Sequence, residues 1–254
     1  NFEIPEPVFK FGDNNIPISV NEKTSLESHN IVEEMMLLAN QCVAKHLSKN
    51  ISIYRIHPKP PIEDLKPLLE TLNYMGLGNY LDIKDIRGKD IQKLLKHIKN
   101  HSLLVLVENL LLRALPKAVY STANVGHFGL GFSSYTHFTS PIRRYPDILV
   151  HRLLLNDFKN DNSAEIKTIC ANSTSSEIIA MKAEREYTKI KQLRFIESQI
   201  TRTFNGLISG IIPSGLFIQL DDILVDGFIN RDWLEDDYYK FNDKSHSFIG
   251  RKYK

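Results

Sequence analysis

The chain has 254 residues and a mass of 29.2 kDa, which suits one large domain or one and a half, and its 42% of hydrophobic residues is ample for a core. Lysine and arginine number 32 against 30 aspartates and glutamates, so the formal charge of +2 neither requires nor excludes nucleic acid, because a local basic stripe matters more than the total. The two cysteines, Cys42 and Cys170, are far apart and in no metal-ligand spacing, which argues against a disulfide framework and fits a reducing compartment.

The first part of the chain is predicted to be helical after an extended start. Residues 1–20 are punctuated by prolines and are expected to be extended. Residues 25–47 predict a long amphipathic helix, capped by Ser25 or Ser28. One apolar stripe of this helix consists of Ile31, Met35, Leu38 and Cys42. A short β-like run is expected at 51–56 and further helices at 61–74, 89–99 and 102–114.

The next segment is predicted to contain a proline-initiated helix. Pro146 fits the first helical position, and Asp147 falls in the first turn, where the helix dipole favours a negative charge. This helix is expected to run to about residue 157. The other expected elements are short strands at 117–120 and 128–130, a polar loop at 158–175 and a long helix at 176–200.

The hydrophobic pattern changes to a period of two after residue 200. Residues 204–209 and 216–220 flank Pro213-Ser214-Gly215, which is typical of a hairpin, and 223–229 predict a third strand. Three strands are all that this pattern predicts before Lys254. The longest apolar run is far too short to span a bilayer, and no signal-peptide pattern is present, so a cytoplasmic protein without membrane contact is expected.

The most informative stretch lies in the middle of the chain. It reads Gly-His-Phe-Gly-Leu-Gly at 126–131 and Tyr-Thr-His-Phe-Thr-Ser-Pro-Ile-Arg-Arg-Tyr-Pro-Asp at 135–147. The planar fork of arginine matches phosphate oxygens in a bidentate way, and aromatic rings let nucleobases stack. The stretch therefore predicts a site that holds a polynucleotide backbone.

This stretch resembles, almost residue for residue, the signature near the C-terminal end of the catalytic RNB domain of the ribonuclease II/ribonuclease R family. The resemblance implies a processive 3′-to-5′ exoribonuclease that hydrolyses single-stranded RNA to 5′-nucleoside monophosphates. It also implies a helix-rich α/β catalytic domain over residues 1–200 and the truncated start of an all-β OB-fold RNA-binding barrel over residues 201–254. A monomer is expected.

The resemblance implies Mg²⁺ as cofactor, because phosphodiester hydrolysis generally uses divalent ions held by clustered carboxylates. In the family these are aspartates near the start of the catalytic domain, and no such motif occurs here. We therefore expect no metal site in this chain, ligands upstream of it, and a C-terminal fragment that does not hydrolyse RNA alone. Asp221-Asp222 and Asp236-Asp237 are interpreted as turn acids.

The central stretch provides the candidate catalytic residue. By resemblance, Arg143 is expected to contact the scissile phosphate and to stabilise the charge that grows in the transition state; the alternative is a surface arginine paired with Asp147. Arg144 and Tyr145 are further candidate RNA-binding residues; the alternative is that the second of two neighbouring arginines points elsewhere for structural support. Ser140 is expected to bind phosphate or to cap a helix.

Other candidate RNA contacts lie elsewhere in the chain. By resemblance, Glu33 is expected to accept a hydrogen bond from a ribose 2′-hydroxyl, and Phe2 to stack on the terminal base. Each has a plain alternative, a solvated helix glutamate and a frayed terminus. The remaining candidates, each of which could instead be solvated or structural, are Arg55, His57 and His127 near phosphates, and Glu184 and Arg185 near the active-site phosphates.

A second hypothesis stays open at this point. The chain could belong to a non-catalytic RNA-binding protein with a remnant catalytic domain and an OB barrel. Clustered aspartates in the upstream sequence would favour the enzyme, and their absence would favour the binding protein.

Overall fold

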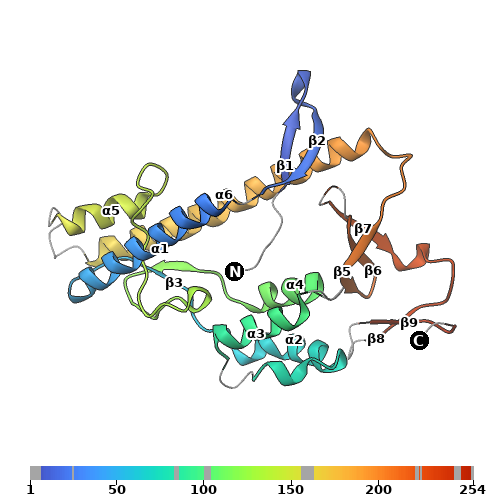
Figure 1. The fold of residues 1–254 in the computed structure, drawn as a ribbon, viewed down its shortest axis with the longest axis horizontal. Helices are drawn as coiled ribbons and strands as arrows, with labels where there is room; N and C mark the ends of the chain where they lie inside the picture. The colour runs from blue at the N-terminus through green and yellow to red at the C-terminus, as the bar shows by residue number, and fades with distance from the viewer. Residues whose placement is uncertain are drawn as a thin grey trace. The chain divides into compact units, whose positions relative to one another are not determined.

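The computed structural model describes residues 7–24, 26–82, 86–99, 104–155, 163–220, 223, 225–242 and 247–252, without the side chains of Glu22, Val105 and Leu106. Most of its helices and strands are labelled in Figure 1. Contacts divide the chain into two compact units. The first combines Asn1–Thr24, Pro61–Ala114 and Glu184–Lys254, and the second combines Ser25–Pro60 with Leu115–Ala183. The boundary at residues 200 and 201 stays a prediction.

The second unit is built from three helices and a two-stranded sheet. Helices α1 (Glu27–His46), α5 (Tyr145–Leu154) and the first part of α6 (Ser163–Glu197) accompany β3 (Tyr54–Ile56), which pairs antiparallel with β4 (Val119–Ser121). The core residues of this unit are Leu47, Ile53, Tyr120, Leu149, Val150, Ile166 and Cys170. The core therefore joins the strands to α5 and to the beginning of α6.

The prediction of a loop over 158–175 is wrong from residue 163 onward, where α6 begins; residues 158–162 lie outside the described part. Ile166 and Cys170 are four residues apart, so they lie on one helical face and are buried in the core. The hydroxyls of Thr168 and Thr174 donate to the carbonyls of Ala164 and Cys170, at 3.0 and 2.9 Å. These polar residues are thereby accommodated inside a helix.

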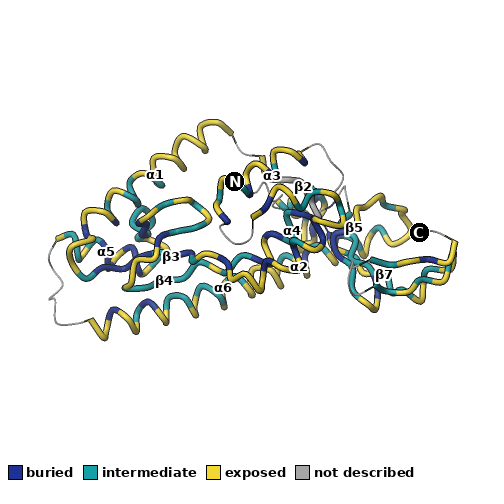
Figure 2. The backbone as a smooth tube through the Cα atoms, turned by 90° about the horizontal axis from the view of Figure 1, so that it is seen from below, coloured by how far each residue is buried: buried dark blue, intermediate teal, exposed yellow. Residues whose placement is uncertain are grey.

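Helix α1 forms where the sequence predicts it, but its predicted apolar stripe is not buried. Ile31, Met35, Leu38 and Cys42 are exposed, while Asn40 and Ala44 on another face are buried. Figure 2 shows that much of α1 is exposed. The period of the pattern thus predicted the helix correctly and its buried face wrongly.

The first unit contains a hairpin, three helices, the rest of α6 and five strands. Its helices are α2 (Ile62–Tyr74), α3 (Gly88–Ile98) and α4 (Leu104–Ala114), and β1 (Pro7–Phe11) pairs with β2 (Pro17–Glu22). The three helices bury Leu65, Leu68, Leu72, Leu94, Ile98, Val107 and Leu111. A second cluster consists of Val20, Phe195, Ile223 and Val225.

The described residues after position 200 form five strands, two more than predicted. Strands β5 (Gly206–Ile212), β6 (Gly215–Leu220) and β7 (Asp226–Asn230) form an antiparallel sheet in that order, which confirms the predicted hairpin. The two strands that were not predicted are β8 (Lys240–Asn242) and β9 (Ser247–Ile249). Each is three residues long; they pair antiparallel, and the rings of Phe241 and Phe248 pack against each other across the pair. In the described part of the chain no strands close into a barrel, so an OB barrel is not confirmed.

The short 3₁₀ helices are η1 (Asp13–Asn15), η2 (Leu47–Lys49), η3 (Gly78–Tyr80), η4 (Phe128–Leu130) and η5 (Arg231–Trp233). The prediction of a strand at 128–130 is therefore wrong. His127 caps η4, because its Nδ1 accepts from the backbone N–H of Leu130 at 3.2 Å. No helix in the described part is long and apolar enough to cross a membrane.

Candidate nucleic-acid interface

A tight corner precedes α5 in the second unit. The backbone N–H groups of Arg143 and Arg144 both donate to the carbonyl of Ser140, at 3.3 and 3.1 Å. Asp147 in the first turn of α5 is fully buried, and its Oδ2 accepts from Ser140 N at 2.7 Å and from Arg144 Nη2 at 2.8 Å. A buried carboxylate thus fixes both ends of the corner.

The two adjacent arginines have different surroundings. The side chain of Arg144 is 18% exposed and forms the ion pair with Asp147. Arg143 is exposed, and the described residues give its guanidinium neither an ion pair nor a hydrogen bond. The alternative in which Arg143 pairs with Asp147 is therefore not what the structure contains, because Arg144 takes that place.

Two histidines accept hydrogen bonds from backbone groups of the glycine-rich segment 126–131, to which His127 itself belongs. His57 Nδ1 accepts from the N–H of Gly129 at 2.8 Å, so its Nε2 carries the proton and donates to the carbonyl of Pro116 at 2.6 Å. A Cβ at Gly129 would come within 2.8 Å of His57 Nδ1, so this close approach requires glycine. The rings of His57 and His127 lie 5.2 Å apart.

Both histidines are held neutral. Burial lowers the pKa of His57, and burial beside His57 and the charged Arg55 lowers the pKa of His127 to about 4. A neutral imidazole fits the geometry, because one nitrogen of each ring accepts from a backbone N–H. These rings are hydrogen-bonding groups at neutral pH and not cations.

A partly buried network joins β3, β4 and α6. Arg55 forms a bidentate pair with Glu177 at 2.5 and 2.8 Å, and its Cζ lies 4.7 Å above the ring of Tyr120. The hydroxyl of Tyr120 is 2.8 Å from Nδ1 of His137. Burial raises the pKa of Tyr120 to about 12, and burial with the charges of Arg144 and Arg55 lowers the pKa of His137 to about 2.

Helix α1 is connected to the same segment through Asn40. Its Nδ2 donates to the hydroxyl of Tyr135 at 3.0 Å, and its Oδ1 accepts from the backbone N–H of Phe138 at 2.9 Å. Glu33 is exposed on the same helix. The segment that leads into the corner is therefore anchored to α1.

The predicted site residues fall into three groups. The second unit contains the corner, both histidines and Arg55, and it also carries Glu33. Tyr145 is exposed at the start of α5, whereas the guanidinium of Arg55 is occupied by Glu177. Glu184 and Arg185 are exposed on α6 in the first unit, and Phe2 lies outside the described residues. Their contacts with RNA stay predictions.

Comparison with known proteins identifies the family. The RNB domain model matches residues 1–159, which is more than half of the chain. The chain belongs to the RNB domain family.

Curated RNB proteins resemble the whole chain. Ribonuclease R of Ureaplasma parvum is 33% identical over 276 residues, covering 100% of this chain and 38% of that protein. Ribonuclease R of Aquifex aeolicus is 35% identical over 259 residues, covering 98% of this chain and 36% of that protein. The chain thus spans well under half the length of these relatives.

A solved RNB structure has the same fold. Mycoplasma genitalium RNase R in complex with ribose methylated single-stranded RNA matches with a TM-score of 0.88 and 31% identity, over 98% of this chain and 41% of that one. Its apo form matches with a TM-score of 0.87 over 98% of this chain and 40% of that one, again at 31% identity. The prediction of this family from the central stretch is confirmed.

For several residues of this RNB site no role was predicted from the sequence. Glu177 lay one residue inside the predicted helix 176–200, but nothing in the sequence connects it to Arg55. Thr136 is fully buried, and its hydroxyl donates to the carbonyl of Ile53. Asn40 interrupts an apolar helical pattern, and that interruption is the one signal by which it could have been found.

Divalent-metal ligands are not clustered in the described part of this RNB chain. No group of three His, Cys, Asp or Glu side chains there is arranged to hold an ion. His97 and His101 share a four-residue spacing, but His101 lies outside the described residues. His97 stacks on Tyr80 with ring centroids 4.5 Å apart. The residues present therefore do not fit a metal centre.

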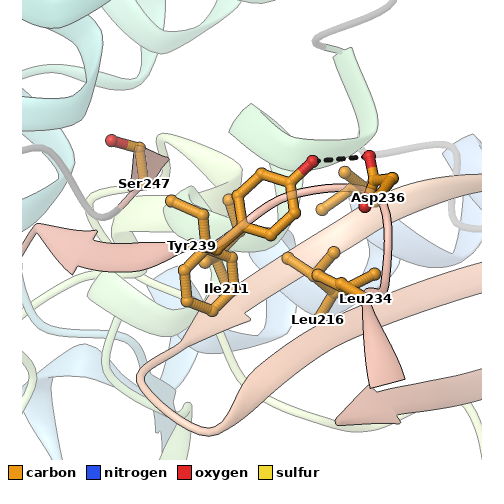
Figure 3. Close-up of a pocket in the computed structure, with 8 residues that line it drawn as sticks. Ile211, Leu216, Leu234, Asp236, Tyr239 and Ser247 are labelled. Carbon is orange, nitrogen blue, oxygen red and sulfur yellow. Dashed lines mark hydrogen bonds between the residues drawn. The ribbon is translucent and has the colours of Figure 1, made fainter. Parts of the chain in front are cut away.

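An apolar hollow lies among the strands after residue 200. Its cavity of about 320 Å³ is lined by Ile208, Ile211, Leu216, Leu234, Asp236, Tyr239, Ser247 and Phe248. Figure 3 shows the hydroxyl of Tyr239 directed at Asp236, to whose Oδ2 it donates at 2.8 Å. Polar groups that could orient a ligand are few here, so the corner near α5 is the stronger candidate.

Proposed function

We propose that the chain is part of a 3′-to-5′ exoribonuclease that processively hydrolyses single-stranded RNA to 5′-nucleoside monophosphates. Two features support this. The curated relatives are named ribonuclease R, and a solved relative holds single-stranded RNA. The observation that carries the proposal is the corner at 140–147, which presents at Arg143 an exposed guanidinium for which the described residues provide no ion pair.

The chemistry of the corner suits a phosphodiester. In hydrolysis the phosphoryl oxygens gain negative charge, and a preorganised cation near them lowers the barrier. Arg143 supplies that cation, whereas the guanidinium of Arg144 is neutralised by Asp147. Neutral His127 remains available as a hydrogen-bond donor through its Nε2–H, because its Nδ1 accepts from Leu130.

RNB exoribonucleases generally depend on a divalent metal, and we propose that the ion is Mg²⁺. When bound, it would polarise the phosphoryl oxygen. The described residues do not cluster as its ligands, so we expect the ligands to come from other parts of the protein. We further propose that β5–β9 belong to an OB-type RNA-binding barrel and that the protein is a cytoplasmic monomer.

The test uses the whole gene product that includes residues 1–254 and a 5′-labelled single-stranded RNA in Mg²⁺ buffer. We expect the labelled RNA to be shortened from its 3′ end to a short product without accumulated intermediates, and chromatography of the reaction to show release of 5′-monophosphates. Arg143→Ala should lower kcat by about 10²- to 10³-fold while changing RNA affinity much less. Affinity is measured in chelator, so that bound RNA is not cut.

Arg152→Ala is the matched control, because Arg152 is an exposed arginine in the last turn of α5. It should behave like the wild type. An equal loss of kcat and affinity in Arg143→Ala would make Arg143 a binding residue. RNA binding without any monophosphate release by the wild type would favour the non-catalytic RNA-binding protein.

A further inference from the structure

Asp147 is the buried charged group at the centre of the corner. Its carboxylate has no solvent exposure, and both of its hydrogen bonds converge on Oδ2. Within the described part of the chain Oδ1 has no hydrogen-bond partner, and neither has Nε of Arg144. Burying a carboxylate costs free energy, so a buried aspartate at this position suggests that it holds neighbouring groups in a specific geometry.

The two groups that donate to Asp147 Oδ2 indicate which part of the chain it holds in place. One is the backbone N–H of Ser140, where the corner begins, and the other is the side chain of Arg144, where it ends. Arg143 lies between these two fixed points, and its own N–H donates to the carbonyl of Ser140. The position of the Arg143 Cα and the direction of its Cα–Cβ bond therefore depend on the carboxylate of Asp147.

We infer that Asp147 is a positioning residue for Arg143, which aims the exposed guanidinium at the scissile phosphate. The inference rests on the proposed function. Asp147 cannot touch RNA itself, because it is fully buried and its side chain is already bound to Ser140 and Arg144. A displacement of about 1 Å at a reacting group can cost about 10²-fold in rate, so the corner needs such support.

The test is a double-mutant cycle in the whole gene product, with Asp147→Asn, Arg143→Ala and the double variant. Asparagine keeps the shape of the side chain but loses the charge that holds Arg144. We expect Asp147→Asn to lower kcat at saturating RNA by 10- to 10²-fold, with RNA affinity in chelator changed less than about 3-fold. In the Arg143→Ala background the same substitution should cause no further loss.

Asp64→Asn serves as the matched control, because Asp64 is an exposed aspartate in the first turn of a different helix, α2. It should leave kcat unchanged. A residue that merely stabilises the fold would lower activity in both backgrounds by the same factor. Equal losses with and without Arg143 would therefore overturn the inference while leaving the proposed function intact.

Two further outcomes are informative. If Arg143→Ala itself keeps full kcat, both the proposed role of Arg143 and the inference fail. If Asp147→Asn does not fold, as judged by thermal unfolding, the cycle is repeated with Arg144→Lys, which keeps the cation and the bond from Ser140 but loses the planar fork. If Arg144→Lys lowers kcat in the wild-type background but not in the Arg143→Ala background, the inference is supported. If it lowers kcat equally in both backgrounds, the inference is overturned.

Discussion

The bidentate pair between Arg55 and Glu177 allows a quantitative test of the buried network. Breaking a fully buried pair costs about 3–5 kcal/mol, because it leaves one charge without compensation. The side chain of Arg55 is 12% exposed and that of Glu177 is 35% exposed, so water screens part of this cost. We therefore expect Glu177→Gln to lower the free energy of unfolding by about 2–3 kcal/mol.

The double variant Arg55→Met/Glu177→Leu separates the cost of an orphaned charge from the loss of the pair. It removes both charges and keeps apolar volume, so it should be more stable than Glu177→Gln alone. It still loses the cation–π contact with Tyr120, worth about 0.5–1 kcal/mol or more in a desolvated position. A net loss of about 1 kcal/mol relative to the wild type is expected.

Urea unfolding at pH 7.5, followed by far-UV circular dichroism, measures these differences. Glu186→Gln, at an exposed position of α6, is the control and should stay within about 0.5 kcal/mol of the wild type. A Glu177→Gln variant as stable as this control would contradict the expected cost of an unpaired Arg55. A double variant less stable than Glu177→Gln would contradict it too, because an apolar pair would then be worse than an unpaired guanidinium.

Three further predictions concern stability. Burial lowers the pKa of His137 in the folded state, so between pH 6.5 and 5 the unfolded chain binds a proton at this residue and the folded chain does not. As the pH decreases through this range, the free energy of unfolding should decrease by about 1.4 kcal/mol per pH unit from this group. His137→Asn should be correspondingly less sensitive to pH, and parallel pH profiles of the unfolding free energy for variant and wild type would contradict this. Asn40→Leu should cost about 2–4 kcal/mol by chemical denaturation, because it leaves the buried N–H of Phe138 and the hydroxyl of Tyr135 without Asn40, and a loss below about 0.5 kcal/mol would contradict it. Leu72→Ala should cost about 2–5 kcal/mol because it opens a cavity in a fully buried position, whereas Tyr74→Ala at the exposed end of the same helix should cost much less.

The sequence predicted where helices and strands form better than it predicted which residues they pack against. The period of the α1 pattern indicates a helix, but the buried face contains Asn40 and Ala44 and not the most apolar stripe, and period alone cannot decide which face meets a core. Residues 163–175 of the predicted loop are helical because Ile166 and Cys170 pack into a tertiary core, which overrides the weak helix propensity of the surrounding polar residues. Tertiary packing decided both cases.

The candidate site was predictable to the extent that it is a local motif. The corner, with Pro146 and Asp147 in the first turn of α5, follows from adjacent residues, whereas the burial of Asp147 was not predicted. The Arg55–Glu177 pair joins residues 122 positions apart, and the Asn40–Phe138 bond joins residues 98 apart. Such contacts depend on how helices pack, so the sequence predicted the guanidinium at Arg143 but not what surrounds it.

The charges in the second unit follow a consistent scheme. Arg55 is neutralised by Glu177 and Arg144 by Asp147, while the positive charge of Arg55 helps to keep His57, His127 and His137 neutral. Arg143 differs from the other two arginines because the described residues provide no carboxylate for it. A phosphate that approaches the corner would therefore meet a guanidinium that need not first leave an ion pair. For the same reason, replacing Arg55 or Arg144 should destabilise the fold first, whereas replacing Arg143 should affect catalysis with little change in stability.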